Sequence, residues 1–187
     1  MYIKRFLEEK IIKNSKLYPV IMVCGQRQVG KSTMLHHLME PNRKYVTLDD
    51  QNARRLAEND PALFFETYGA PLLIDEFQRV PSILLEMKRI VDEMMLNGED
   101  CNGMFWLTGS QKFPMMKSVA DSLSGRVGIF DLSSFSTAEL EGRNAAVFSP
   151  VIDDLKKRTA DNRPKDIHQI FDRIFKGGMP KLLTTEI

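Results

Sequence analysis

Hydrophobic and polar residues follow two patterns along the chain, and each pattern predicts one kind of element. Short apolar runs bounded by Gly, Pro, Asn or Asp predict β-strands. The first run begins at Val20, and four more lie at residues 44–48, 72–74, 104–108 and 127–132. Between these runs apolar residues recur every three or four positions, which predicts helices. Strands that alternate with helices predict an α/β fold, in which a mainly parallel five-stranded sheet has helices on both faces.

Two stretches show the helical pattern most clearly. Residues 2–14 place apolar residues at helical spacing with Lys and Glu between them, which predicts an amphipathic helix before the first strand. These apolar residues are Ile3, Phe6, Leu7, Ile11 and Ile12. In PSILLEMKRIVDEMMLNG, Pro81 suits a first helical turn and Gly98 can cap the end. The apolar stripe predicted for this second helix consists of Leu84, Met87, Val91, Met94 and Met95.

The alternation of strands and helices stops at about residue 142. Two helical pieces follow within residues 149–183, separated by a polar stretch that contains Pro164. We therefore expect residues 1–142 to form the core domain and residues 143–187 to begin a helical lid or linker that is incomplete at Ile187. An incomplete lid would expose an apolar helix face, so we expect self-association or a mobile C-terminus. That face contains Ile170, Phe171, Ile174 and Phe175.

Charge and composition narrow the partners. The chain has 187 residues, with 26 Lys and Arg against 25 Asp and Glu, so its formal net charge is only +1. This balance does not indicate nucleic acid or a membrane as a partner, although nucleic acid stays possible. No apolar run approaches the ~20 residues of a membrane span, and the charged start is unlike a signal peptide, so we expect a cytoplasmic protein. Cys24 and Cys101 are expected to be free thiols.

The stretch VIMVCGQRQVGKSTMLHHL contains the clearest chemical motif. Gly25, Gly30, Lys31 and Ser32 satisfy G-x-x-x-x-G-K-[ST], a loop that binds nucleotide phosphates. Glycines let the backbone curl so that N–H groups point at phosphate oxygens, and the following helix adds positive charge at its N-terminus. A glycine-rich turn can match this pattern by chance. The apolar strand before the loop and the helical pattern after it favour phosphate binding.

Each residue of this loop has an expected role. Lys31, taken as an exposed loop residue, would reach the β- and γ-phosphates, and Ser32 would bind Mg²⁺. Gln28, Val29 and Thr33 complete the predicted nucleotide contacts of the loop. The loop therefore predicts a bound nucleotide and Mg²⁺.

A second motif, APLLIDEFQ, places two carboxylates at the end of an apolar strand. Asp75 can hold Mg²⁺ through water, and Glu76, on the other side of the backbone, can polarise an attacking water. The pair therefore suggests hydrolysis. The alternative is that Glu76 caps the next helix or pairs with Arg79. Its position one strand unit after the phosphate loop favours the catalytic role.

Polar residues after other strands are weaker candidates. The fourth strand ends in LTGSQ, where Thr108, Ser110 or Gln111 could sense the γ-phosphate, although polar residues at strand ends also serve turns. Asp49 and Asp50 could support the Mg²⁺ water shell or form an ordinary turn.

Arg126, just before the fifth strand, is a candidate catalytic cation. It could neutralise charge on the γ-phosphate in this subunit or in a neighbouring one. A salt bridge to Asp121 or Asp131 explains it equally well.

The order of motifs in the chain resembles a known family. GQRQVGKST, YVTLDD, DPALFFETYGAPLLIDEFQRVP, FWLTGSQ, SLSGRVGIFDLSSFSTAEL and FKGGMP together look like the bacterial and archaeal AAA-superfamily ATPases that carry an AAA module followed by a C-terminal domain of unknown function. The resemblance implies a P-loop ATPase whose fourth strand lies between the first and third. It also implies that this chain is the ATPase module of a longer protein.

The family's functional residues carry over position by position. The resemblance places its Walker B pair at Asp75 and Glu76 and its sensor region at Thr108 to Gln111. It places the Walker A residues at Gly25, Gly30, Lys31 and Ser32. The departures are Gln26, where a proline is usual, and Met179, where an aromatic residue is common.

Three functions remain open at this point. The first is a hydrolytic ATPase that drives or switches an unknown protein partner. The second is a P-loop kinase acting on a small molecule, which has no need of a carboxylate that primes water. The third is a nucleotide-binding switch or interaction module with negligible turnover.

Overall fold

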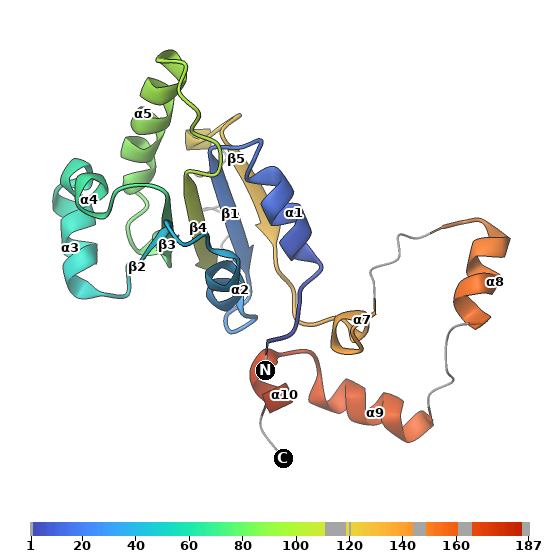
Figure 1. The fold of residues 1–187 in the computed structure, drawn as a ribbon. Coiled ribbons are helices and arrows are strands. Elements are labelled where there is room, and N and C mark those ends of the chain that lie inside the picture. Colours follow the sequence, from blue (N-terminus) through green and yellow to red (C-terminus); the bar gives the residue numbers. More distant parts are fainter. Residues whose placement is uncertain (1, 111–118, 120, 144–148, 161–165, 185–187) are drawn as a thin grey trace. The chain divides into compact units, whose positions relative to one another are not determined.

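A parallel β-sheet forms the centre of the fold. The computed structural model describes residues 2–110, 119, 121–143, 149–160 and 166–184. Within these residues the strands are β1 (Val20–Gly25), β2 (Lys44–Thr47), β3 (Leu72–Asp75), β4 (Phe105–Ser110) and β5 (Val127–Asp131). Their order is β2-β3-β4-β1-β5, and every pair of neighbours is parallel (Figure 1). The predicted five-stranded sheet, with β4 between β1 and β3, is confirmed.

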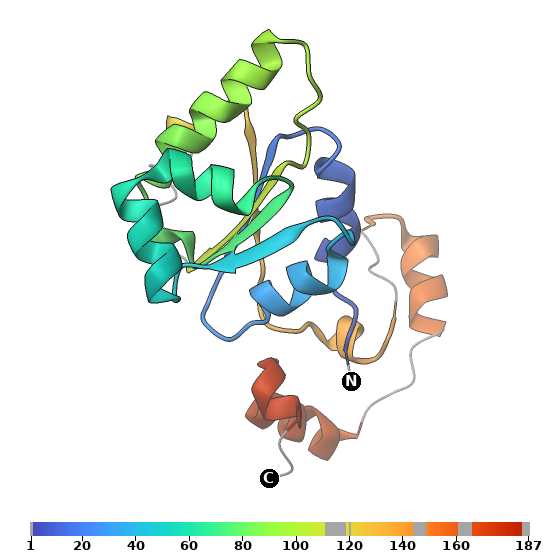
Figure 2. The same ribbon diagram turned by 60° about the vertical axis from the view of Figure 1, so that its left-hand side comes forward.

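Helices cover both faces of this sheet, as Figures 1 and 2 show. One face carries α1 (Leu7–Asn14) and α2 (Lys31–Leu38). The other carries α3 (Gln51–Asn59), α4 (Pro61–Tyr68), the 3-10 helix η1 (Phe77–Arg79) and α5 (Ile83–Leu96). The remaining described helices are α7 (Thr137–Leu140), α8 (Ile152–Ala160), α9 (Ile167–Lys176) and α10 (Pro180–Thr184).

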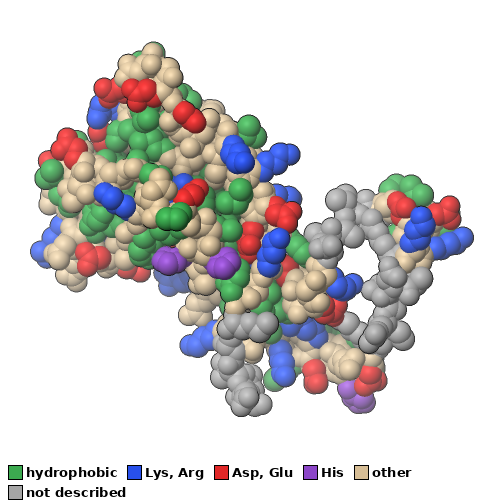
Figure 3. Space-filling view, in the orientation of Figure 1, with side chains coloured by type: hydrophobic (Ala, Val, Ile, Leu, Met, Phe, Trp, Pro, Cys, Tyr) green, Lys and Arg blue, Asp and Glu red, His purple; other side chains and the backbone are tan. Residues whose placement is uncertain are grey.

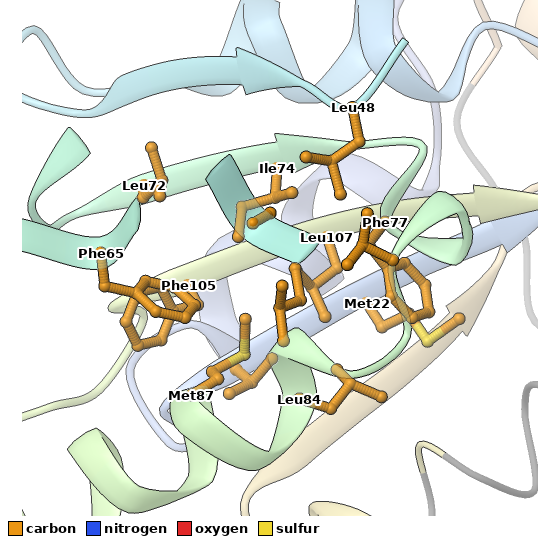
Figure 4. Close-up of a cluster of buried hydrophobic side chains, with 14 of the residues drawn as sticks. Met22, Leu48, Phe65, Leu72, Ile74, Phe77, Leu84, Met87, Phe105 and Leu107 are labelled. Atoms are coloured by element: carbon orange, nitrogen blue, oxygen red, sulfur yellow. The ribbon is translucent and has the colours of Figure 1, made fainter. Parts of the chain in front are cut away.

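The strands read as continuous apolar runs because both faces of the sheet are buried. Alternate residues of β1 face opposite sides: Ile21 packs on the α1 and α2 side, and Met22 packs in the core under α5. Figure 4 shows this second layer, where Ile74 and Leu107 from the sheet meet Met87 from α5. Burying each such side chain contributes about 1.5–3 kcal/mol, so this core stabilises the packing of α5 on the sheet.

Two predicted helices differ in detail from the structure. The first begins at Leu7 and not at residue 2, because Arg5 and the Phe6 N–H bind the side chain of Glu139. In α5, Met95 is 47% exposed, while Ile83 is fully buried, so the predicted stripe was wrong at its C-terminal end.

The predicted cap at the end of α5 is present. Gly98 has a φ of +72°, a left-handed conformation that favours glycine. Its N–H donates to Met95 O at 3.1 Å, and the N–H of Glu99 donates to Met94 O at 2.9 Å. These two bonds form a Schellman motif, which satisfies carbonyls at the helix end.

The chain divides into two compact units. One spans Leu7–Ser133, and the other combines Met1–Phe6 with Ser134–Ile187. In the smaller unit, Arg5 pairs with Glu139 at 3.1 Å. Burial raises the pKa of Glu139, but hydrogen bonds from Ser136, Phe6 and Arg5 outweigh it and leave the pKa below its usual value. The domain boundary predicted after residue 142 stays a prediction.

Apolar side chains lie exposed on the helices of the smaller unit. None of the residues of α9 is buried, and the exposed ones include Ile170, Phe171, Ile174 and Phe175. Hydrophobic side chains are also visible on α8, at the upper right of Figure 3. Pro164 lies outside the described residues. Self-association through these helices stays a prediction.

The paired glycines of FKGGMP have a packing role in this unit. Gly178 O accepts a hydrogen bond from Phe135 N at 2.8 Å. A Cβ at Gly178 would lie 2.4 Å from Phe135 O, so the two backbones can approach only because residue 178 is glycine.

Candidate functional site

The predicted site residues gather at the carboxyl edge of the sheet. The loop from Gly25 to Gly30 follows β1, Asp75 ends β3, and Thr108 lies near the end of β4. The register pairs Gly25 with Ser110, so the ends of β1 and β4 are level. Loops at this edge of a parallel sheet are where α/β proteins bind their ligands.

The loop after β1 depends on left-handed backbone conformations. Gln28 has a φ of +64° and Gly30 a φ of +94°, and Val29 between them is fully buried. A Cβ at Gly25 would lie 2.2 Å from Leu132 O, so glycine is needed there for packing against the end of β5. Gly30 begins α2 and has no side chain that could cap it. The first N–H groups of α2 are therefore left to an anion or to water.

Lys31 is buried and folds back over the loop. Its side chain is only 6% exposed, so the expectation of an exposed residue was wrong. Nζ donates to Gly25 O at 3.1 Å and to Gln26 O at 2.9 Å. Burial lowers the pKa of the Lys31 ammonium, and the negative charges of Glu76 and Asp75 oppose that shift. The loop thus holds a cation close to two carboxylates.

Asp75 accepts hydrogen bonds from three hydroxyl groups. Ser32 Oγ donates to Oδ1 at 2.6 Å, Thr108 Oγ1 also donates to Oδ1, and Tyr45 Oη donates to Oδ2 at 3.3 Å. Asp75 is 8% exposed, so these bonds compensate for its desolvation. Burial and the nearby Asp75 raise the pKa of Tyr45.

The two oxygen groups Ser32 and Asp75 suit magnesium. Mg²⁺ prefers oxygen ligands, and proteins often supply one or two while phosphates and waters supply the rest. In the described part of the chain there is no cluster of three or more His, Cys, Asp or Glu residues able to hold a metal.

Glu76 adopts neither of the structural roles considered for it. Its side chain makes no cap of η1, and Arg79 pairs instead with Asp49 at 2.9 Å. The backbone of Glu76 is left-handed, with φ +55°, and its N–H donates to Thr108 Oγ1 at 3.1 Å. Its carboxylate accepts a hydrogen bond from Gln78 Nε2. A non-glycine residue held in this conformation is a reason to look for function.

Other candidates have structural explanations. Asp50 caps α3, because its Oδ1 accepts from Asn52 N at 3.0 Å and Ala53 N at 2.9 Å. Asp49 pairs with Arg79, as described above. Thr33 is exposed and Ser110 is half-buried. Gln111 lies outside the described residues.

Arg126 lies apart from the other predicted site residues. It precedes β5 and accepts a hydrogen bond from Val20 N at 3.0 Å, which places it at the amino edge of the sheet. The carboxyl edge lies one strand length away. Its guanidinium pairs with Asp92 on α5, and not with Asp121 or Asp131 as considered from the sequence. A role in a neighbouring subunit stays a prediction.

Two side chains of the site were missed from the sequence, Tyr45 and Gln78. Tyr45 lies on β2, next to β3, and its register partner there is Leu73. Its reach to Asp75 depends on that strand order, which periodicity cannot give. Gln78 follows Glu76 by two residues, and a polar residue so close to a candidate base is a signal that could have been used.

Comparisons with known proteins identify the family and the fold that this chain resembles. A family model described as an AAA domain matches residues 17–141. Two uncharacterized proteins, from Mycobacterium bovis and Mycobacterium tuberculosis, are each 31% identical over 131 residues. The match covers 68% of this chain but only 28% of each mycobacterial protein.

Among the solved structures similar to this chain is the Walker-type ATPase PABY2304 of Pyrococcus abyssi. It matches 96% of this chain and 65% of its own length, with a TM-score of 0.53 and 14% identity. This likeness supports the fold alone. No helix in the described ranges has the length and apolar character of a membrane span.

Proposed function

Because the chain belongs to the AAA domain family, whose model matches residues 17–141, we propose that it binds ATP with Mg²⁺ and hydrolyses it to ADP and phosphate. The family and fold make it an AAA-type P-loop NTPase domain. The observation that carries the finer proposal is the convergence of Lys31, Ser32, Asp75 and Glu76 at one edge of the sheet.

Binding would be the work of the loop and of α2. The uncapped N–H groups at the start of α2 would donate to phosphate oxygens. Lys31 would exchange its bonds with the Gly25 and Gln26 carbonyls for the β- and γ-phosphates, as charge-assisted contacts are stronger. Ser32 and Asp75 would hold Mg²⁺, which when bound would offset the negative charge of the phosphates.

Hydrolysis would use Glu76 as the general base. The oxygen of a water forms a bond to the γ-phosphorus while the bond from that phosphorus to the bridging oxygen of ADP breaks. Glu76 takes the proton of the water, and the products are ADP and inorganic phosphate. Thr108 would hold Asp75 and Glu76 in fixed positions relative to each other, since its hydroxyl donates to Asp75 and accepts from the Glu76 N–H.

A kinase reading has less support than hydrolysis. Glu76 directly follows Asp75 at the end of β3, so a second carboxylate is available next to the residues that would hold Mg²⁺. In a kinase, the molecule that accepts the phosphate would have to take the place of the water that Glu76 could activate as a general base. The curated relatives are much longer than the matched part, since it covers 28% of each. We propose that the ATPase module serves such a longer protein and an unidentified protein partner.

Neutralising Asp75 and neutralising Glu76 should have different effects, one on ATP binding and the other on hydrolysis. Asp75→Asn should weaken Mg²⁺-dependent ATP binding, because an amide does not offset the metal's charge. Glu76→Gln should bind ATP normally but hydrolyse it about 10²–10⁴-fold more slowly, the usual contribution of a positioned general base. Calorimetric ATP titrations and single-turnover phosphate release measure the two effects.

The matched control is Asp49→Asn, which neutralises an exposed carboxylate paired with Arg79 and should change neither quantity. Hydrolysis by Glu76→Gln at the parent rate would contradict the hydrolytic proposal. It would leave a kinase or a silent nucleotide-binding module as the better explanation.

A further inference from the structure

The side chain of Gln78 has an unusual hydrogen-bonding state. Its Nε2 donates to Glu76 Oε2. The ionised carboxylate can only accept, so this contact fixes which end of the amide faces Glu76. The other end, Oε1, is buried without a partner. Among the described residues it is the sole buried side-chain nitrogen or oxygen in that state.

Stability does not explain this arrangement. A buried acceptor without a partner costs about 1–3 kcal/mol, whereas an apolar side chain of the same shape would avoid that cost. Gln78 lies in η1, between Phe77, which is fully buried in the core, and Arg79, which pairs with Asp49. The backbone at Gln78 is therefore held on both sides, and the amide is presented to Glu76 from a fixed position.

The contact completes the restraint of Glu76. The main chain of Glu76 is held by its N–H bond to Thr108. Its carboxylate would otherwise rotate freely, and the bond from Gln78 removes that freedom. Thr108 also donates to Asp75, and Asp75 accepts a hydrogen bond from Ser32 at 2.6 Å. A chain of hydrogen bonds therefore links Glu76 to the residue that follows the phosphate loop and Lys31.

We propose that Gln78 is a positioning residue for hydrolysis. By donating from Nε2 to Glu76 Oε2 it holds the carboxylate toward the phosphate loop, where the second oxygen of Glu76 accepts the proton of the attacking water. The unpartnered Oε1 is the energetic cost of that orientation. This role rests on the proposed ATPase function, and it makes Gln78 act through Glu76 without touching the substrate.

The variant that tests the role is Gln78→Met, which keeps the length of the side chain but removes both the donor and the unpartnered acceptor. The melting temperature should stay the same or rise, because the buried acceptor is gone. ATP affinity should be unchanged. Single-turnover phosphate release should slow by about 10- to 100-fold, the effect of a misplaced catalytic group. Gln78→Ala provides a second variant with the same expected slowing, and Gln51→Met, on the exposed start of α3, is the control.

A double-mutant cycle separates positioning from general damage. In a Glu76→Gln background, adding Gln78→Met should change the residual rate by less than about twofold, because coupled residues are not additive. Equal slowing in both backgrounds, or hydrolysis by Gln78→Met at the parent rate, would overturn the inference while leaving the ATPase function intact. A parent chain that releases no phosphate would overturn both.

Discussion

The two edges of the parallel sheet use their charged residues in different ways. In the candidate site at the carboxyl edge, neutral groups bind the charged side chains: carbonyls bind Lys31, hydroxyls bind Asp75 and an amide binds Glu76. The exposed pair of Arg79 with Asp49 at the same edge is not part of this set. At the amino edge, Arg126 pairs with Asp92, and Arg43 pairs with Glu40 at 2.8 Å. A charged side chain that is bound by neutral dipoles still attracts a ligand of opposite charge. In an ion pair, the charge of the partner largely cancels that attraction.

The direction of the strands explains the difference. At the carboxyl edge the loop after β1 leads into α2, whose N-terminus carries partial positive charge. At the amino edge the strands begin, and the charged residues connect segments of the chain to one another: Arg126 to α5, and Arg43 to Glu40. Arg43 lies 4.0 Å over the ring of Trp106 and donates to Gly103 O at 2.8 Å, which ties the start of β2 to the start of β4.

The largest expected effect belongs to the cation at the carboxyl edge. Lys31→Ala should weaken Mg-ATP binding by about 10- to 100-fold, since a hydrogen bond to a charged group contributes ~1.5–3 kcal/mol. Isothermal titration calorimetry of the folded variant measures this. Lys10→Ala, on the exposed side of α1, is the control. Undiminished binding by Lys31→Ala would remove the functional distinction between the edges.

The buried arginine at the amino edge should affect stability instead. Arg43→Met removes the pair with Glu40, the bond to Gly103 O and the contact with Trp106. We expect the free energy of unfolding to fall by about 2–3 kcal/mol. Urea unfolding followed by tryptophan fluorescence gives this value. The ATP affinity of the folded variant should match the parent, and a loss of affinity equal to that of Lys31→Ala would contradict the comparison.

A smaller effect is expected from the hydroxyl that links the two carboxylates. Thr108→Val keeps the shape of a fully buried residue but removes its bonds to Asp75 and Glu76. Hydrolysis should slow by about 10-fold, which corresponds to ~1.4 kcal/mol of lost transition-state stabilisation. Phosphate release under single-turnover conditions tests this, with Thr67→Val on α4 as control. An unchanged rate would mean that Thr108 only supports packing.

The smallest effect is expected at the other end of the same sheet. Arg126→Gln removes a partly exposed pair with Asp92, and such pairs contribute about 0–1 kcal/mol to stability. Hydrolysis by the isolated chain at low concentration should equal the parent rate. A rate of the variant that falls below the parent rate only at high protein concentration would contradict this expectation. It would mean that Arg126 acts on the nucleotide of a neighbouring subunit.

The strands and the phosphate loop were predictable because local physics determines them. Strands buried on both faces need continuous apolar runs. The loop favours glycine at Gly30, where φ is +94°, and needs it at Gly25, where Leu132 O approaches. The place of β4 between β1 and β3 followed from the family resemblance, since periodicity alone does not give strand order.

What failed depends on side-chain contacts that the pattern of residues along the chain does not show. The partner of Arg126 is on α5, 34 residues earlier, and not one of the nearby aspartates. Lys31 is buried because its side chain reaches back to the Gly25 and Gln26 carbonyls, which a count of polar neighbours does not reveal. The first helix begins late because Arg5 and Phe6 contact Glu139, more than 130 positions away.

The location of the nucleotide is the central claim, and amide chemical-shift mapping tests it most directly. The 21.5 kDa chain is titrated with Mg²⁺ and a non-hydrolysable ATP analogue. The account predicts the largest shifts at residues 25–33, at Asp75 and Glu76, and around Thr108, with little change at Arg43, Gly103 and Arg126. Largest shifts at the amino edge, or none at saturating nucleotide, would contradict it.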